Sequence, residues 1–566
     1  MRYTYPDFAH NHDFLRYQTR KALMHNLARE SWTWRPNPRA PSLPLRRYGA
    51  WHPGEGFGGS GVHWSAMHYR FLPQDFRLRS HYTERYGRGI LPEGTAIQDW
   101  PVSYEELEPY YTRVDYDLGV SGQVGNLQGE ILEGGNPYEP HSRPYPLPPL
   151  VVNLPSQMFA ATCRDLGYRP FPQPAGIHSQ AYTDPFGRTR SGCLYCGFCT
   201  RYGCEVDAKA NGHNVYAPLA LASERWEIRP HSKVTRITTD RDGLATGVTY
   251  VDLASGEEHQ QPAELVLVTG YALSNVRTLL LSRSPQHPNG VGGDRGRLGR
   301  NLSYQMWQTP ATGVFEGRRF NLFMGNTATQ TTIYDLYGDN FDHEELGFIG
   351  GAAFYCAAGE REPIGAADDM PFGDDRQGDV AGTTGGENGG ANGRKWGRAW
   401  KEAFARDWDA FAPILIQGDS LAYEAHRFDL DPTFRDALGQ PLLRLTFDFR
   451  ENEYRLYRHI ARKAAEIMRV MNPTWMSTQA ELEPFNIRDY QSTHINGGAV
   501  MGTDPGNSVT NRYGQVWDTP NVFVTGSALY PQNPGANPSA TLSALAYMTG
   551  EALVERYFSD PEQLLT

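Results

Sequence analysis

Apolar residues recur at helical spacing in several stretches of the chain. The clearest stretch is 454–471, in which five residues fall on one face of an amphipathic helix: Tyr457, Ile460, Ala464, Ile467 and Met471. The stretch 539–557 shows the same spacing from Leu542 to Leu553. We expect further helices over 15–27, 104–118, 157–167 and 274–282.

Other stretches show the patterns of strands. Over 226–251 apolar and polar residues alternate, which predicts successive half-buried strands. Residues 263–270, AELVLVTG, form a continuous apolar run that ends in glycine, as buried parallel strands do. Residues 310–360 are aromatic, and we expect them to form antiparallel strands. The chain therefore combines helices with both kinds of strand pairing.

The segment 491–541 brings a base and an amide close to the start of the last helix. His494 comes first, a short strand over 521–525 follows, and a loop ends at Asn537 and Pro538. Proline suits the first helical position, and asparagine before it is a good N-cap. The helix start also presents N–H groups that favour a phosphate or an anionic flavin ring. Asn537 is then either only a cap or part of a site that polarises an alcohol.

The composition narrows the class of protein. The 566 residues are 39% apolar and 12% aromatic, which is enough for two or more packed layers. A net charge of −11 without a basic stripe argues against a nucleic-acid partner. No run of 18 apolar residues occurs, so no direct membrane span is expected. The first residues, MRYTYPDFAHNHDF, lack the apolar core of a signal peptide, so export would depend on a partner.

Four of the six cysteines lie close together, at Cys193, Cys196, Cys199 and Cys204. Thiolates at this spacing, C-x2-C-x2-C-x4-C, can face one point, which suits a metal or an iron–sulfur cluster better than strained disulfides. The alternatives are a structural zinc ion and thiols that are unliganded or disulfide-linked. The spacing leaves open whether the cluster holds three or four irons and which cysteines bind it. Cys163 and Cys356 stand apart, and we expect them to be ordinary buried cysteines.

One segment has a composition unlike the rest. Residues 367–394 are rich in glycine and acidic residues and cannot bury apolar area. We expect a flexible surface loop there, which is either a plain insertion or a lid over the site.

Several longer motifs occur in a fixed order along the chain, in addition to the segment 491–541. They are GAWHPGEGFGGSGVHWSAMHYRF (49–71), LRSHYTERYG (78–87), IQDWPVSYEELEPYY (97–111), CLYCGFCTRYGCEVDAKA (193–210), NFDHEELGFIGG (340–351) and GQPLLRLTFDF (439–449). Together they resemble the glucose–methanol–choline (GMC) oxidoreductases, and within them the flavoprotein (large) subunits of gluconate 2-dehydrogenase-like bacterial sugar dehydrogenases.

The resemblance implies an α/β (α+β) fold of two domains. An FAD-binding domain with a mixed sheet and a substrate or cap domain with an antiparallel sheet and helices are expected. The FAD-binding domain would span 1–75, 205–305 and 480–566, and the cap domain 76–204 and 306–479, with the cysteine-rich loop 193–204 and the loop 367–394 in the latter.

The resemblance also implies the roles of site residues. His494 matches the catalytic base, and a base whose pKa is near neutrality suits this task. Asn537 matches the residue that hydrogen-bonds the substrate oxygen. His63 is either joined covalently to FAD or is a packed loop histidine. The implied flavin contacts are Gly58, Gly59, Ser60, Gly61, His63, Val234, Gly526, Ser527 and Pro538.

The chain departs from the family at its start. Members open with a strand, a GxGxxG turn and a helix that hold the FAD pyrophosphate. Here GFGGSG (56–61) follows no clear strand, and it matches a later loop that passes over the flavin. Either the start codon is placed too late, which we favour, or this form lacks the dinucleotide cradle and its sheet lacks a central strand.

These features imply an FAD-dependent dehydrogenase that oxidises a secondary alcohol of a sugar or sugar acid, gluconate at C2 or a glycoside at C3. Electrons would leave through an iron–sulfur cluster (3Fe-4S or 4Fe-4S) to a cytochrome c subunit, and a small chaperone-like subunit would assist. The resemblance places such complexes in the periplasm, peripheral to the inner membrane through partner subunits, with the cytoplasm as the alternative. An oxygen-using oxidase and a flavin-free structural subunit are the other hypotheses.

Overall fold

The computed structural model describes most of the chain. It covers residues 31–45, 50–51, 53–54, 56–197, 199–200, 202–322, 327–356, 397–487 and 492–564. The helix expected over 15–27 and the loop 367–394 lie outside the described residues.

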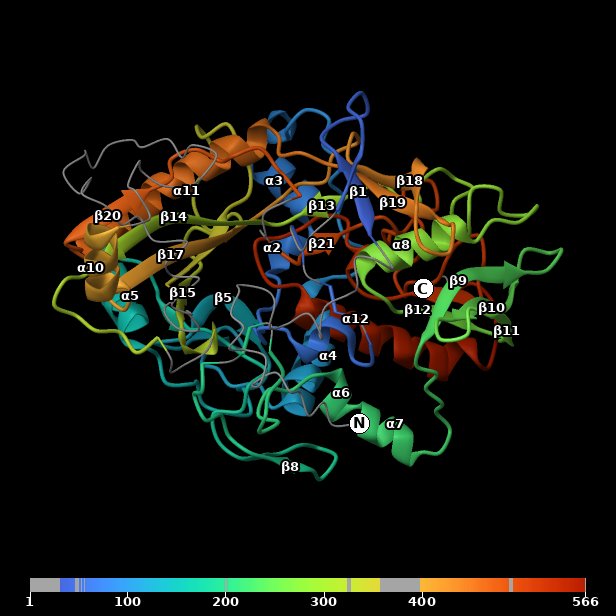
Figure 1. The fold of residues 1–566 in the computed structure, drawn as a ribbon, viewed down its shortest axis with the longest axis horizontal. Helices are drawn as coiled ribbons and strands as arrows, with labels where there is room; N and C mark the ends of the chain where they lie inside the picture. Colours follow the sequence, from blue (N-terminus) through green and yellow to red (C-terminus); the bar gives the residue numbers. More distant parts are fainter. Residues whose placement is uncertain are drawn as a thin grey trace.

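A large antiparallel sheet dominates one side of the molecule (Figure 1). Its strands follow the order β20 (Trp475–Thr478), β14 (Met306–Val314), β17 (Phe411–Gly418), β16 (Ala352–Cys356), β15 (Thr331–Ile333) and β6 (Phe171–Pro172). Helix α11 (Glu451–Val470) lies across one face and buries Ile460, Ala464 and Ile467, which confirms the face predicted from the sequence. Helix α5 (Leu154–Asp165) packs against β15 and β16.

The other side of the molecule carries smaller sheets. Strands β9 (Ser232–Thr239), β10 (Ala245–Asp252) and β11 (Glu258–Pro262) form an antiparallel sheet, which confirms the strands expected within 226–251. Strand β12 (Val266–Val268) pairs in parallel with β22 (Val522–Val524), and helix α8 (Ala272–Leu281) follows β12. The parallel pairing was predicted, but the expectation of a wholly buried strand was wrong. Val266 and Val268 are buried, whereas Leu267 is exposed on the opposite side of the strand.

Two helices cross the middle of the molecule (Figure 1). Helix α4 (Tyr104–Leu118) begins with a capping box of Ser103 and Glu106 and packs against α12 (Ser539–Ala552). The hydroxyl groups of Tyr111 and Thr541 form a buried hydrogen bond of 2.6 Å between the two helices. Helix α12 continues into a π-helical turn, η8 (Leu553–Tyr557). The N-terminus of α12 is thereby held in the centre of the fold.

The remaining sheets join distant parts of the chain. A four-stranded sheet has the order β18 (Arg427–Arg435), β19 (Pro441–Thr446), β1 (Trp32–Arg35) and β2 (Leu43–Pro44). A two-stranded sheet pairs β13 (Ser303–Tyr304) with β21 (Ile495–Asn496). Smaller sheets contain β3 (Val124–Leu127), β4 (Glu130–Ile131) and β5 (Asn136–His141), and β7 (Tyr182–Thr183) with β8 (Thr189–Arg190).

Short helices complete the described fold. They are η3 (Gly59–Val62), α2 (Pro73–Phe76), α3 (Leu78–Tyr86), η4 (Arg88–Ile90), α6 (Gly212–Val215), α7 (Ala217–Ala222), η5 (Thr327–Thr329), α10 (Arg398–Asp407) and η7 (Ser527–Leu529).

The division into two domains stays a prediction. All six strands of the large sheet come from the segments expected to form the cap domain, whereas β9 to β13, β21 and β22 come from those expected to bind FAD. Strand β1, expected in the FAD-binding domain, pairs with β19 of the other group.

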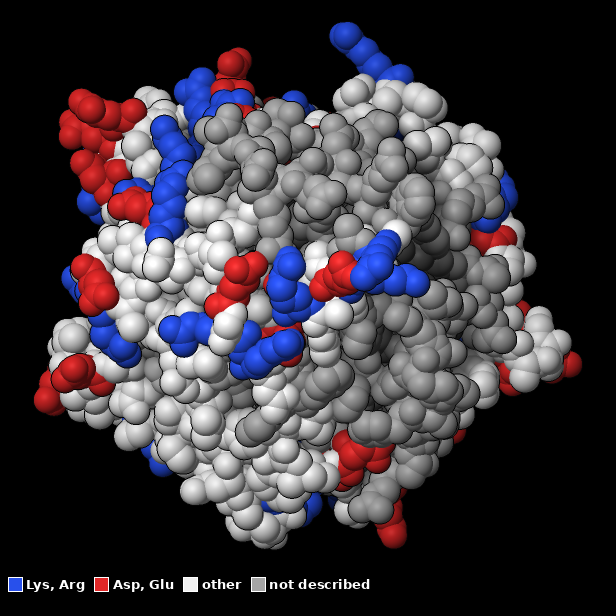
Figure 2. Space-filling view, turned by 60° about the vertical axis from the view of Figure 1, so that its left-hand side comes forward, with Lys and Arg blue, Asp and Glu red and all other residues white. Residues whose placement is uncertain are grey.

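The surface carries charges of both signs. On the face shown in Figure 2, Lys and Arg side chains are interspersed with Asp and Glu. No helix among the described residues is both long enough and apolar enough to cross a bilayer.

Candidate active site

The pairing of β13 with β21 brings His494 beside Gln305. Ser303 pairs with Asn496 and Tyr304 with Ile495, so the next positions along the ladder are Gln305 and His494. The backbone N–H of Gln305 donates to the carbonyl oxygen of His494 at 3.1 Å. Two residues far apart in sequence are thus held in register by an antiparallel ladder.

Both nitrogens of the His494 ring have partners. Nδ1 lies 2.5 Å from Oε1 of Gln305, and Nε2 lies 3.2 Å from Nδ2 of Asn537. An amide nitrogen donates and cannot accept, so Nε2 of His494 accepts this bond. Burial lowers the pKa of His494 to about 3, and the ring is therefore neutral at ordinary pH. A neutral Nε2 that accepts a weak bond is ready to take a proton from an alcohol.

Asn537 does not cap the last helix. The N-cap of α12 is Pro538, and the helix has no side-chain cap, because the Asn537 amide turns to His494 instead. The expectation of Pro538 at the first helical position was wrong by one residue. The first N–H groups of an uncapped helix lack intrahelical partners and favour an anion, so this helix start suits the anionic end of a reduced flavin.

The loop that carries Asn537 is held at several points. Asn533 and Ser420 exchange two backbone hydrogen bonds, and Nδ2 of Asn533 donates to the His494 carbonyl at 2.7 Å. The N–H of Gly535 donates to Oδ1 of Asp419 at 2.5 Å. Burial raises the pKa of Asp419 to about 6. These bonds fix the position of Asn537 before any substrate arrives.

Gly526 and Ser527 lie in the same region. Oγ of Ser527 donates to the carbonyl oxygen of Ile495 at 2.9 Å, and the N–H of Gly497 donates to the Ser527 carbonyl at 3.0 Å. Gly526 adopts φ 85°, in the left-handed region that glycine favours. The structure therefore brings Gly526 and Ser527 close to His494, Asn537 and Pro538, and the roles of these residues stay predictions.

Buried polar atoms around His494 fit a polar ring system. Within the described part of the chain, both polar atoms of the Asn496 amide and Oδ1 of Asn533 and Asn537 have no hydrogen-bond partner. Such atoms are costly to bury unless a ligand or water completes them. A flavin ring has the complementary donors and acceptors, so the residues around His494 fit the flavin ring of FAD.

The glycine loop lies beside the end of the cysteine-rich segment. Gly58 and Gly59 adopt φ 94° and 52°, and η3 follows directly. A Cβ on Gly58 would approach Cβ of His213 to 3.1 Å. Nζ of the buried Lys209 donates to the carbonyl oxygens of Trp64, Cys199 and Tyr202 at 2.7–2.8 Å. The loop around Ser60, Gly61 and His63 is therefore tied to the cysteine-rich segment.

The cysteines themselves do not converge. The described residues contain no group of three or more Cys, His, Asp or Glu side chains that could hold a metal ion. Cys199 is buried, Cys193 and Cys204 are half-buried, and Cys196 is exposed. The arrangement described does not fit a preformed iron–sulfur cluster, although the spacing predicts one. Cys163 and Cys356 are buried, as expected.

Val234 lies on β9, apart from His494. Its side chain is exposed on the three-stranded sheet at the right of Figure 1. The contact with the cofactor that the resemblance implies for Val234 stays a prediction.

Three buried glutamines share one face of the large sheet. Because alternate residues of a strand share a face, the register places all three on the face opposite the one that α11 covers. Gln330 and Gln173 are cross-strand neighbours, whereas Gln417 lies further along the sheet, opposite Ala353. Both side-chain atoms of Gln173 and Oε1 of Gln330 and of Gln417 lack partners in the described structure. A Cβ on Gly535 would lie 2.7 Å from the backbone carbonyl oxygen of Gln417, so the end of β17 lies against the loop that carries Asn537.

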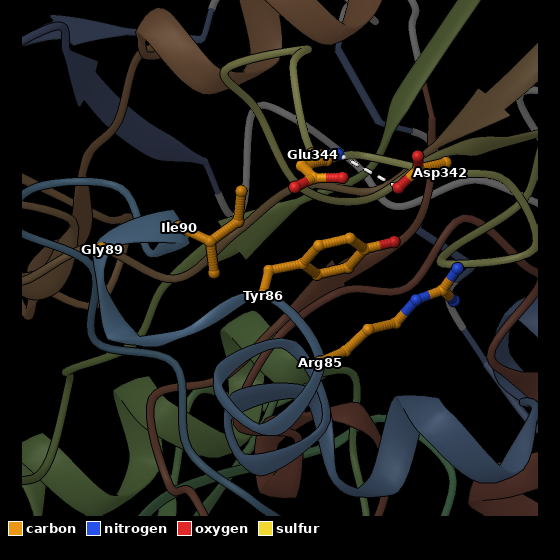
Figure 3. A pocket seen from close by; sticks show the side chains of 6 residues that line it. All are labelled: Arg85, Tyr86, Gly89, Ile90, Asp342 and Glu344. Carbon is orange, nitrogen blue, oxygen red and sulfur yellow. Dashed lines mark hydrogen bonds between the residues drawn. The ribbon is translucent and has the colours of Figure 1, made fainter.

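A separate pocket of about 510 Å³ opens at the surface (Figure 3). Arg85, Tyr86, Gly89 and Ile90 line it together with Asp342 and Glu344. Arg85 and Tyr86 already bond the buried carboxylate of Asp339, and the N–H of Glu344 donates to Asp342. None of these bonds involves His494, Gln305 or Asn537.

The chain is similar to known proteins of one enzyme family. A family model described as GMC oxidoreductase matches residues 426–546. The gluconate 2-dehydrogenase flavoprotein of Pantoea cypripedii is 35% identical, over 99% of this chain and 89% of that protein. The chain belongs to the GMC oxidoreductase family. As a GMC oxidoreductase it is an FAD-dependent enzyme that acts on alcohol groups.

More distant relatives agree with this assignment. The large subunit of fructose dehydrogenase from Gluconobacter japonicus is 24% identical over 89% of this chain and 79% of that protein. The crystal structure of pyridoxine 4-oxidase from Mesorbium loti has a TM-score of 0.54 at 14% identity, and covers 95% of this chain and 90% of that chain. This likeness confirms the predicted mixed α/β fold of a GMC oxidoreductase.

Gln305, Asn496 and Asn533 were missed by the sequence reasoning. Gln305 lies 189 residues from His494 and belongs to no motif. Asn496 lies two residues after His494, and strand periodicity could have placed both on one face.

Proposed function

We propose that this GMC oxidoreductase is a dehydrogenase that oxidises a secondary alcohol of a sugar or sugar acid. C2 of gluconate is the leading position, and C3 of a glycoside is the next. The observation that carries the proposal is the pair of His494 Nε2 and Asn537 Nδ2, which are 3.2 Å apart and offer one acceptor and one donor to a single hydroxyl oxygen. The 35% identity to a gluconate 2-dehydrogenase flavoprotein supports the choice of gluconate.

In this mechanism a substrate hydroxyl takes the place of the direct bond between His494 and Asn537. Asn537 Nδ2 donates to the substrate oxygen, and the hydroxyl proton passes to Nε2 of His494. The bound flavin would supply the acceptor for the hydride that leaves the carbon. The fixed loop at 533–537 keeps the amide in place while charge develops on the oxygen.

The buried glutamine face supports a polyhydroxylated substrate. Both amide atoms of Gln173 and Oε1 of Gln330 and of Gln417 have no hydrogen-bond partner among the described residues, and hydroxyl groups can both donate to and accept from amides. The end of β17, which carries Gln417, lies against the loop that carries Asn537, so a sugar bound at His494 and Asn537 would have Gln417 on its side of the site. These residues would select for hydroxyl groups rather than for charge.

The exit of electrons is a separate part of the proposal. An iron–sulfur cluster on Cys193, Cys196, Cys199 and Cys204, a small chaperone-like subunit, a cytochrome c subunit and a periplasmic location rest on the family resemblance and the cysteine spacing. The tie between Lys209 and the glycine loop supports a role for this segment near the flavin. Among the described residues these cysteines form no group that could hold a metal ion, so the described arrangement itself gives the cluster no support.

Purified protein tests the proposal in two steps. Its absorption spectrum should show flavin bands, and a broad additional shoulder would indicate the cluster. Gluconate and a panel of glycosides are then supplied with an artificial electron acceptor, and the product is identified by NMR. A keto acid formed from gluconate at C2 supports the leading substrate, and hydrogen peroxide formed in place of reduced acceptor would indicate an oxidase. A colourless protein that oxidises none of the alcohols would refute the proposal.

A further inference from the structure

We infer that Gln305 is a positioning residue that fixes the tautomer and orientation of His494, an inference that deepens the proposed function and rests on it. The side-chain hydrogen bonds of Gln305 go to His494 and to the backbone carbonyls of Pro534 and Ala536. Gln305 acts through the one ring nitrogen of His494 that does not face Asn537.

The orientation of the Gln305 amide is determined by its surroundings. Nε2 donates to the carbonyl oxygen of Pro534 at 3.0 Å and to that of Ala536 at 2.9 Å. If the amide were turned over, its oxygen would face two other acceptors and no donor. The nitrogen therefore points to the carbonyls, and Oε1 points to Nδ1 of His494.

This orientation determines where the ring proton lies. Oε1 of Gln305 can only accept, so Nδ1 of His494 must carry the hydrogen. A neutral imidazole has one N–H, so Nε2 keeps its lone pair and faces the Asn537 amide. The other tautomer would place a lone pair against Oε1 and an N–H against an NH2 group. Both contacts disfavour that tautomer.

Gln305 is rigid as well as oriented. Its side chain is fully buried, and its backbone N–H is bonded to the His494 carbonyl. Through Pro534 and Ala536 the same amide holds the loop on which Asn537 lies. The Gln305 side chain thus orients the His494 ring and also holds the loop that carries Asn537. A change at Gln305 should therefore disturb both residues.

The proton balance is consistent with this role. Nε2 takes the hydroxyl proton; the bound flavin would accept the hydride, so the two together would account for both hydrogens lost when the alcohol becomes a carbonyl compound. His494 becomes an imidazolium that still donates from Nδ1 to Gln305. Gln305 takes no proton and remains a neutral acceptor throughout.

The first test is the tautomer itself, read by ¹⁵N NMR of histidine-labelled protein, with His494→Ala to assign the signal. We expect a protonated Nδ1 and an unprotonated Nε2 at pH 7. A protonated Nε2 would overturn the inference. This readout needs no substrate, so it stands even if the proposed sugar chemistry fails, and the substrate panel stands if the tautomer is wrong.

Two variants of Gln305 test whether it positions the His494 ring or only supports the fold. Gln305→Met keeps the side-chain length but removes the acceptor, so we expect mixed tautomers and kcat lower by about 10- to 100-fold, the range for a lost orienting partner. Gln305→Glu keeps an acceptor at Nδ1 but adds charge, which raises the pKa of His494, so the acid limb of kcat should move to higher pH. If both variants keep the wild-type tautomer and pH profile, Gln305 is only structural and the inference is wrong.

Gln515→Met is a matched control for lost support. Gln515 is also fully buried, and its Nε2 donates to the carbonyl oxygens of Pro520 and Glu562 at 2.7 and 2.9 Å. It touches no residue of the site. We expect this variant to lower Tm and to leave the His494 tautomer and the pH profile unchanged. A shifted His494 signal in this variant would show that loss of any buried glutamine alters the ring, and would also overturn the inference.

Discussion

The surroundings of His494 and the cysteine-rich segment 193–204 are built in opposite ways. His494, Gln305 and Asn537 come from distant parts of the chain, yet hydrogen bonds connect them in a continuous network. Cys193, Cys196, Cys199 and Cys204 are close in sequence, yet they differ in exposure and form no ligand group among the described residues. Proximity in sequence is thus a poor guide to a finished site. Convergence depends on register and on the bonds that fix each side chain.

The strongest test of this contrast is the removal of the base. His494→Ala should lower kcat by about 10²- to 10⁴-fold, the range for lost general-base catalysis. The measurement is steady-state turnover of the best sugar substrate at equal flavin content. Turnover within a few-fold of wild type would remove His494 from the mechanism.

The amide partner should have the next largest effect. Asn537→Ala deletes the donor to the substrate oxygen and leaves the start of α12 as it is, because Asn537 does not cap that helix. We therefore expect kcat to fall by about 10²-fold, as for one lost donor to a developing charge. If Asn537 were only a helix cap, the loss would appear in Tm, measured by calorimetry, and not in kcat.

The hydrogen bonds of Asp419, which hold the loop that carries Asn537, should contribute to the free energy of unfolding. Both oxygens of Asp419 accept backbone N–H groups, from Gly351 and Gly535, and an amide would turn a donor toward one of them. Asp419→Asn should therefore cost about 1–3 kcal/mol in the free energy of unfolding by urea. Asp342→Asn is the control, because the exposed Asp342 also accepts a backbone N–H, from Glu344. Equal losses in the two variants would show that burial is unimportant here.

Loss of the Lys209 ammonium group should loosen the cysteine-rich segment 193–204 without a large effect on turnover. Lys209→Met removes the ammonium group that holds the carbonyls of Trp64, Cys199 and Tyr202. Hydrogen exchange should then quicken in 193–204 and in 56–64, with kcat for flavin reduction changed less than in the other variants. Unchanged exchange in both segments would show that Lys209 does not tie them together.

The sequence predicted what depends on local pattern. Helices α4 and α11 lie where expected because capping and apolar spacing are local properties. His494 and Asn537 were found because they belong to motifs, and the structure brings them together.

What the sequence could not predict depends on distant partners. Asn537 follows the local rule for a cap, but its amide finds His494 instead. Gln305 has no motif, since its importance comes from a ladder between β13 and β21. Leu267 is exposed although its run of residues is apolar, because one side of the short β12 strand stays open.

The central claim is that His494 is a neutral base before substrate binds, and the pH dependence of flavin reduction tests it most directly. The flavin band is followed after anaerobic mixing of the purified holoenzyme with its best sugar substrate between pH 5 and pH 8. Burial lowers the pKa of His494 to about 3, so the base form is fully present over this range and the rate constant should be constant. A rate constant that falls tenfold per pH unit below about pH 6.5, the ordinary pKa of histidine, would contradict the account.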